Sequence, residues 1–94
     1  MKGPSRHSLN AMEFTAEIDV MPLPALLDPQ GKAVSNSMKH IGLPEIGEVR
    51  VGKHITLKVV AASRAEAEAK VEEACAQLLA NPIMERYAFR IAEA

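Results

Sequence analysis

The stretch IGEVRVGKHITLKVV, from Ile46 to Val60, decides how the chain folds. The apolar side chains stand at odd positions and the polar ones at even positions on both sides of Gly52–Lys53, an alternation that predicts a strand with one buried face: Val49, Val51, Ile55, Leu57 and Val59 against Arg50, His54, Thr56 and Lys58. The register of this alternation is the same before and after Gly52 and Lys53. A two-residue hairpin there would place apolar side chains opposite polar ones and is therefore disfavoured.

Two interpretations of this stretch stay open. Either a three-residue loop, Gly52 to His54, joins two strands of a hairpin, or one long strand bends at Gly52. Fifteen extended residues would span about 50 Å, whereas a domain of this size is about 30 Å across. A single strand would overhang its own domain and pair with another subunit, which would also enlarge a small hydrophobic core. We favour the long strand.

The same stretch nearly matches the phosphate-binding pattern G-x-x-x-x-G-K-[ST], since GEVRVGKH departs from it only at His54. That motif requires a turn between a strand and a helix, so that backbone N–H groups converge on the phosphates. Here strand-like alternation continues on both sides of Gly52 and no helix start follows. We therefore expect no nucleotide site at this point.

Two further strands and two helices are predicted on either side of this stretch. Residues 13–20 and 86–91 alternate as strands. One helix is expected from the N-cap Asp28, with Pro29 in its first turn, to a stop at Gly42. A second begins at the capping box from Ser63 to Glu66 and ends at the cap Asn81. Gly31, inside the first helix, implies a close backbone approach or a partner at that turn.

The predicted fold is α+β, with an antiparallel sheet and two helices on one face. Its order is β-α-β-α-β, ferredoxin-like, with a long bent central strand or a hairpin in its place. The second helix should bury one stripe, made of Ala67, Val71, Ala74, Cys75 and Leu78. Residues 1–11 are expected to be a disordered tail or an added extension, and residues 12–94 a single domain.

Composition excludes several classes of function. The chain has 94 residues, a net charge of −1 and a single cysteine, Cys75. A nearly neutral chain lacks the basic surface that nucleic acids or anionic membranes need, and no apolar run reaches the roughly 20 residues of a membrane span. One cysteine suits a reducing compartment. We expect oligomerisation or another stabilising device, because a single small core is thin.

No catalytic or metal-binding constellation stands out in the sequence. The histidines His7, His40 and His54 lack metal-ligand spacing, and Cys75 lies on a buried stripe. Two polar clusters could dock a partner. One surrounds the start of the first helix, with Gln30 and Lys32, and the other lies near Gly52, with Arg50 and Lys53.

Three segments carry a resemblance to a known family. The segments LDPQGKAV (27–34), VRVGKHITL (49–57) and ACAQLLANPIMERYAF (74–89) closely resemble the PurS family, the small subunit of phosphoribosylformylglycinamidine (FGAM) synthase. The likeness runs in order from Met12 to about Ala92. In the family motif, Asp28, Pro29, Gly31, Gly52 and Asn81 would be structural, whereas Gln30, Lys32, Arg50 and Lys53 are candidate partner contacts.

The resemblance implies a cytoplasmic protein of de novo purine biosynthesis that forms homodimers or homotetramers. The family member is a non-catalytic assembly subunit that bridges an ATP-dependent synthetase subunit, PurL, and a glutaminase subunit, PurQ, and supports ammonia transfer between them. ATP, magnesium and glutamine would be used by those partners, with no cofactor in this chain. A competing hypothesis is a small ferredoxin-like regulatory module that binds an amino acid or a nucleotide at a subunit interface.

Overall fold

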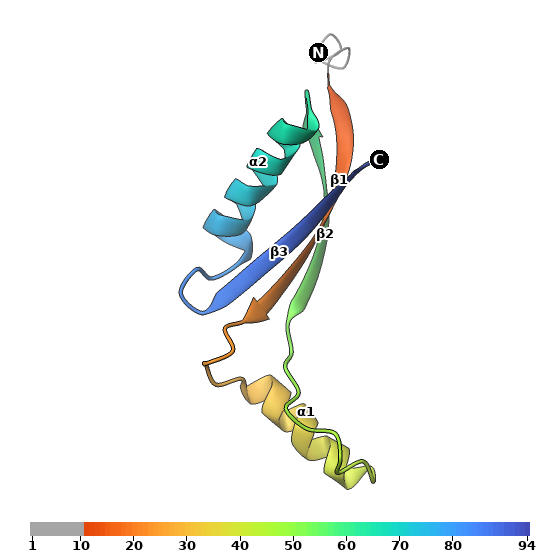
Figure 1. Ribbon diagram of the computed structural model, residues 1–94, viewed down its shortest axis with the longest axis vertical. Coiled ribbons are helices and arrows are strands. Elements are labelled where there is room, and N and C mark those ends of the chain that lie inside the picture. Colours follow the sequence, from red (N-terminus) through yellow and green to blue (C-terminus); the bar gives the residue numbers. More distant parts are fainter. Residues whose placement is uncertain (1–10) are drawn as a thin grey trace.

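The computed structural model describes residues 11–94 and confirms the order β-α-β-α-β (Figure 1). The elements are β1 (Met12–Pro22), α1 (Pro29–His40), β2 (Lys53–Ala61), α2 (Arg64–Ala74), its continuation η2 (Cys75–Leu79) and β3 (Glu85–Glu93). Except for Ala11, the predicted tail lies outside the described residues. Within the described part, every helix is too short or too polar to cross a bilayer.

The sheet is antiparallel and has β1 at its centre, in the order β2-β1-β3. Ala16 lies opposite Leu57 of β2 and Ile91 of β3. The two outer strands are therefore parallel to each other and are joined through α2, with β1 between them. This is a split β-α-β unit of the ferredoxin-like kind, which confirms the predicted fold class.

Alternation along the strands separates a buried face from a wet one, as predicted. Phe14, Ala16, Ile18 and Val20 of β1 are each at most 1% exposed. Half-buried apolar side chains of the outer strands flank them, namely Ile55, Leu57, Val59, Tyr87 and Phe89. Helix α2 packs on this face, where Ala67, Val71 and Cys75 complete the core. The core therefore combines aliphatic side chains with Phe14 and lies in the half of the molecule that contains the sheet.

Helix α2 begins at its predicted cap but ends in an unexpected way. Ser63 accepts a hydrogen bond from the Glu66 amide, and the Glu66 carboxylate accepts one from the Ala62 amide. The last turn is a π-turn, closed by the Ala80 amide on the Cys75 carbonyl at 3.1 Å. A π-turn is wider than an α-turn, so it shifts the facing residue by one position. Consequently Leu78, predicted to be buried, is 81% exposed, whereas Leu79 is half-buried.

Helix α1 has the predicted ends but not the predicted position. Asp28 caps its first turn, and after Ile41 the Leu43 amide bonds to the Met38 carbonyl while Gly42 adopts φ +88°. The helix, however, extends beyond the end of the sheet, and only α2 covers the sheet face (Figure 1). The prediction of two helices on one face was wrong in this respect. Helical spacing places Ala33, Val34, Met38 and Ile41 on one apolar face of this helix, and of these Met38 is half-buried whereas the other three are exposed.

The stretch around Gly52 contains no hairpin, so that alternative was wrong. The chain does not turn back at Gly52; it runs from the end of α1 as one connection and enters β2 at Lys53 (Figure 1). The hydrogen-bonded strand is accordingly shorter than the long strand that we favoured. A Cβ on Gly52 would overlap the Met21 sulfur and the Val20 carbonyl oxygen. This close contact explains why glycine stands where β2 meets the end of β1.

Candidate functional site

Asp28 joins the start of α1 to the segment that leads into β2. Its carboxylate accepts hydrogen bonds from the Gly31 amide at 3.0 Å and from the Val51 amide at 2.9 Å. These two bonds, and the nearby Arg50, hold the pKa of Asp28 below its usual value. The side chain is only 8% exposed. Asp28 therefore does more than cap a helix, because it fixes the direction in which α1 leaves the sheet.

Arg50 ties the same junction together from the other side. Its guanidinium donates to the carbonyl oxygens of Leu23 at 2.8 Å, Leu26 at 3.3 Å and Pro22 at 3.4 Å, and its Nε lies 4.0 Å from Asp28 Oδ2. The rigid fork of five donors suits arginine to several carbonyls at once. Arg50 was predicted as a candidate partner contact, and the structure gives it this internal role.

Gly31 explains why the junction is so tight. A Cβ at this position would lie 2.6 Å from Asp28 Oδ2 and would overlap the Val49 carbonyl oxygen. The close backbone approach that the sequence suggested is therefore present, and it lies between α1 and the segment before β2. Glycine at position 31 allows Asp28 to reach both amides.

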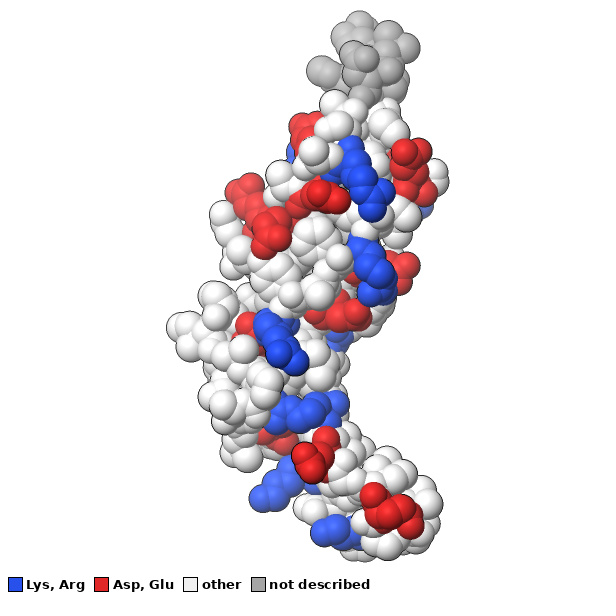
Figure 2. Space-filling model, in the orientation of Figure 1, with Lys and Arg blue, Asp and Glu red and all other residues white. Residues whose placement is uncertain are grey.

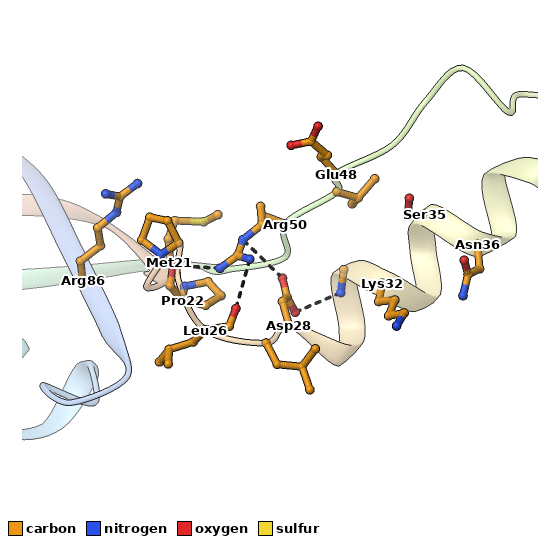
Figure 3. A pocket seen from close by; sticks show the side chains of 14 residues that line it. Met21, Pro22, Leu26, Asp28, Lys32, Ser35, Asn36, Glu48, Arg50 and Arg86 are labelled. Carbon is orange, nitrogen blue, oxygen red and sulfur yellow. Dashed lines mark hydrogen bonds and ion pairs between the residues drawn. The ribbon is translucent and has the colours of Figure 1, made fainter.

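A groove opens between α1 and the end of the sheet (Figure 3). Its volume is about 660 Å³. Apolar and polar side chains line it together: Met21, Pro22, Pro24, Leu26, Val49, Lys32, Ser35, Asn36, Glu48, Arg50 and Arg86. Apolar lining with a few polar groups is typical of a binding groove.

The structure brings some of the predicted residues together and separates others. Lys32 and Arg50 line this groove. Gln30 and Asn81 line a second, smaller groove of about 270 Å³ next to it. Lys53 is exposed at the first position of β2 and lines neither groove. The predicted contacts therefore form a band around the junction rather than a single pocket.

Asn81 was predicted to cap the second helix, but it shapes the turn that starts β3. Its side-chain oxygen accepts hydrogen bonds from the backbone amides of Ile83 at 2.9 Å and Met84 at 3.3 Å. Its backbone amide donates to the Glu85 carboxylate at 2.7 Å. The helix has already ended at Leu79. The prediction that Asn81 caps the second helix was therefore wrong, because its hydrogen bonds lie in the turn before β3.

Sequence reasoning missed several residues of the groove. Glu48 and Arg86 line the groove. In the described part of the chain, Glu48 is the one non-glycine residue with a positive φ, 54°. Arg86 reaches the groove because its strand position lies opposite Met21 at the end of β1. No local pattern reports such a meeting of distant segments.

A second polar cluster lies on the wet face of the sheet. His54 contacts Asp19 at 2.7 Å and Glu17 at 3.2 Å, and Arg90 reaches the same two carboxylates at 3.2 and 3.6 Å. The hydrogen bond to Asp19 is the main cause that raises the pKa of His54, and the bonds to His54 and Arg90 lower the pKa of Asp19. All four side chains are between 45% and 63% exposed, so they form a solvated network across three strands.

Neither cluster has the arrangement of an active site. Cys75 is buried, and desolvation raises the pKa of its thiol, which keeps it unreactive. Tyr87 donates a hydrogen bond to Glu72, and this bond raises the pKa of the phenol. Within residues 11–94, no three His, Cys, Asp or Glu side chains gather as metal ligands would. Charges of both signs are mixed on the face shown in Figure 2.

Comparison with known proteins gives a consistent result. A family model described as PurS, phosphoribosylformylglycinamidine (FGAM) synthase, matches residues 15–93. The phosphoribosylformylglycinamidine synthase subunit PurS of Synechocystis sp. is 40% identical over 68 residues, which cover 72% of this chain and 68% of that protein. The crystal structure of the purS subunit of this synthase from Thermotoga maritima matches with a TM-score of 0.81 and 33% identity, over 92% of this chain and 99% of that one. A chain in the structure of PurLQS from T. maritima matches with a TM-score of 0.78 and 31% identity, over 85% and 98%.

Proposed function

Since the chain belongs to the PurS family of phosphoribosylformylglycinamidine synthase subunits, we propose that it is the small, non-catalytic subunit of this ligase in de novo purine biosynthesis. It bridges the ATP-dependent synthetase subunit PurL and the glutaminase subunit PurQ and supports ammonia transfer between them. The observation that carries the proposal is the match to a chain of the T. maritima PurLQS structure, which covers 85% of this chain and 98% of that one.

The geometry of the chain supports an assembly role. The described residues provide a rigid junction and a band of exposed polar side chains, without a nucleophile next to a base. Gln30, Lys32 and Lys53 are exposed around that junction and remain candidate contacts for the partner subunits. Arg50 contributes indirectly, because it holds the loop from Pro22 to Leu26 in place.

The cofactors and the cellular location follow from the same proposal. ATP, magnesium and glutamine are bound and used by the partner subunits, and this chain contributes no ligand to them. The cytoplasm is the proposed location, because ATP and glutamine must be supplied to the complex there. The regulatory-module hypothesis is not favoured, since the family and structure matches all concern the synthase subunit.

Reconstitution tests the proposal directly. The synthetase and glutaminase subunits of the same organism are combined with and without this chain, and amidine formation is measured with glutamine or with free ammonia as the nitrogen source. Glutamine-dependent turnover should disappear without the chain, whereas ammonia-dependent turnover by the synthetase should remain. Equal glutamine-dependent turnover in both mixtures would refute the proposal.

Charge variants then locate the contacts. Lys32→Glu should weaken assembly of the three subunits, because this side chain lies at the junction. Lys58→Glu serves as the matched control, since Lys58 is also exposed but lies on the wet face of β2, opposite Thr15. If both variants assemble as the unaltered chain does, Lys32 is not a contact.

A further inference from the structure

An exposed apolar patch lies where the turn before β3 meets the loop after β1 (Figure 1). It consists of Leu27, Ile83 and Met84, whose side chains are 78%, 80% and 53% exposed. The Leu23 amide donates a hydrogen bond to the Met84 carbonyl at 2.9 Å, which holds the two segments side by side. Single exposed apolar side chains are ordinary on a protein surface, whereas a group of them that gathers from distant segments indicates a contact site.

The smaller groove opens at this patch, because Leu27 and Met84 both line it. Its volume of about 270 Å³ lies below the roughly 300–1,000 Å³ of ordinary ligand pockets, so it suits one anchoring side chain rather than a free ligand. Among the described residues, the charged ones that line it are Asp28 and Glu85. Both carboxylates already accept hydrogen bonds from backbone amides of the chain. The groove therefore favours an uncharged, apolar occupant.

Both segments that carry the patch are held in place before any partner arrives. The Asn81 side chain accepts hydrogen bonds from the amides of Ile83 and Met84. Arg50 donates to three carbonyl groups of the loop from Pro22 to Leu26, which leads into the patch. A surface that is ordered in advance loses less entropy on association than one that must be ordered by its partner. The patch is thus prepared for docking.

We propose that the apolar patch formed by Leu27, Ile83 and Met84 contacts the synthetase subunit PurL, which inserts an apolar side chain into the smaller groove. This proposal rests on the proposed function, because it names the surface that one of the two catalytic subunits contacts. It differs from the candidate contacts given above, which are polar.

The choice of the synthetase follows from the chemistry of the two surfaces. A bridging subunit needs two contact surfaces, and this chain has the apolar patch and, around the junction, the exposed charges of Lys32 and Lys53. Apolar interfaces are typical of lasting complexes, and polar ones of exchangeable complexes. A glutaminase that released ammonia with no acceptor ready would waste it. The exchangeable contact therefore suits the glutaminase, and the lasting, apolar contact suits the synthetase.

Calorimetric titration of the full chain into PurL of the same organism tests the proposal. Ile83→Lys and Leu27→Lys should each raise the dissociation constant about tenfold or more, since each would bury a charge in an apolar contact. Both side chains point to solvent in this chain, so both variants should fold. Val60→Lys is the matched control, because Val60 is 55% exposed and lies opposite Glu13 at the other end of the sheet. It should bind PurL as the unaltered chain does.

Two further measurements separate this contact from others. The patch variants should keep the affinity of the unaltered chain for the glutaminase PurQ and its mass in sedimentation equilibrium. The proposal is overturned if the unaltered chain does not bind PurL, if both patch variants bind it normally, or if Val60→Lys weakens binding equally. It is also overturned if the loss falls on PurQ or on self-association instead.

Reconstitution distinguishes a failure of this contact from a failure of the proposed function. If the unaltered chain restores glutamine-dependent turnover while both patch variants bind PurL normally, the proposed function holds and the assigned surface is wrong. If the unaltered chain leaves glutamine-dependent turnover unchanged, the proposed function itself fails.

Discussion

Replacing Gly31 by alanine should destabilise the protein, although alanine is the better helix former. In an ordinary helix the substitution would stabilise by up to about 1 kcal/mol. Here the new Cβ would overlap the Val49 carbonyl oxygen and lie 2.6 Å from Asp28 Oδ2. Both neighbours are held in place, one as backbone and the other by two hydrogen bonds. The helix start must therefore move away from the segment before β2.

The size of the effect follows from the bonds that this movement breaks. Asp28 would lose good geometry to the Gly31 and Val51 amides, now at 3.0 and 2.9 Å. Hydrogen bonds to a charged group contribute about 1.5–3 kcal/mol each. After partial relaxation and the gain in helix propensity, we expect a net loss of about 2–4 kcal/mol in the free energy of unfolding.

Urea unfolding followed by circular dichroism, at one fixed protein concentration, measures this loss. The midpoint should fall by on the order of 1 M or more. Gly47→Ala is the matched control, because a Cβ there would meet only Ser35 Oγ, at 3.9 Å. That variant should be unchanged or up to about 1 kcal/mol more stable. A Gly31→Ala protein as stable as the original would refute the close approach of α1 to Val49.

Three further substitutions test other parts of the structure. His54→Gln should lower the free energy of unfolding in mildly acidic solution, because only the protonated ring gains from Glu17 and Asp19. The difference between the two proteins should vanish as the pH rises through the pKa of His54, which is raised above its ordinary 6.5. Urea midpoints of both proteins across pH 5–9 measure this difference. A constant difference would contradict it. Arg50→Lys should lose about 1–2 kcal/mol in the same assay, since a lysine cannot bind three carbonyl groups as the guanidinium does. Glu72→Gln should lower the pKa of Tyr87, which is raised above 10.0 in the unaltered chain. The absorbance of Tyr87, the only tyrosine, reports this pKa. An unchanged titration would exclude the hydrogen bond between Tyr87 and Glu72.

The strands and the helix starts were predictable because their signals are local. Alternation separated the face of Phe14 from that of Glu13, and the caps Asp28 and Ser63 act on amides within three residues of themselves. Such patterns depend only on the period of side chains along the chain and on the unpaired amides at a helix start. They hold whatever the element later packs against.

The position of α1 was not predictable in this way. An apolar stripe indicates that a helix packs on something, but not that the surface belongs to its own chain. Leu78 was misplaced because the stripe was extrapolated at α-helical period through a turn that is π-helical. The groove was missed for a third reason, since Glu48 and Arg86 come to line one groove only through tertiary structure. Of the predicted contact residues, Lys32 and Arg50 line this groove, and their role toward partners stays a prediction.

The central place of β1 in the sheet has a consequence for the order of events during synthesis. Among the described elements β1 comes first in the chain, yet Phe14 pairs with Glu93, which is synthesised about 80 residues later. Until β3 is made, only one edge of β1 can pair with a neighbouring strand, namely with β2. Contacts this distant along the chain slow folding and leave strands exposed to wrong partners. We therefore expect the nascent chain to depend on late closure by β3, and truncation before Glu85 to yield an aggregating product.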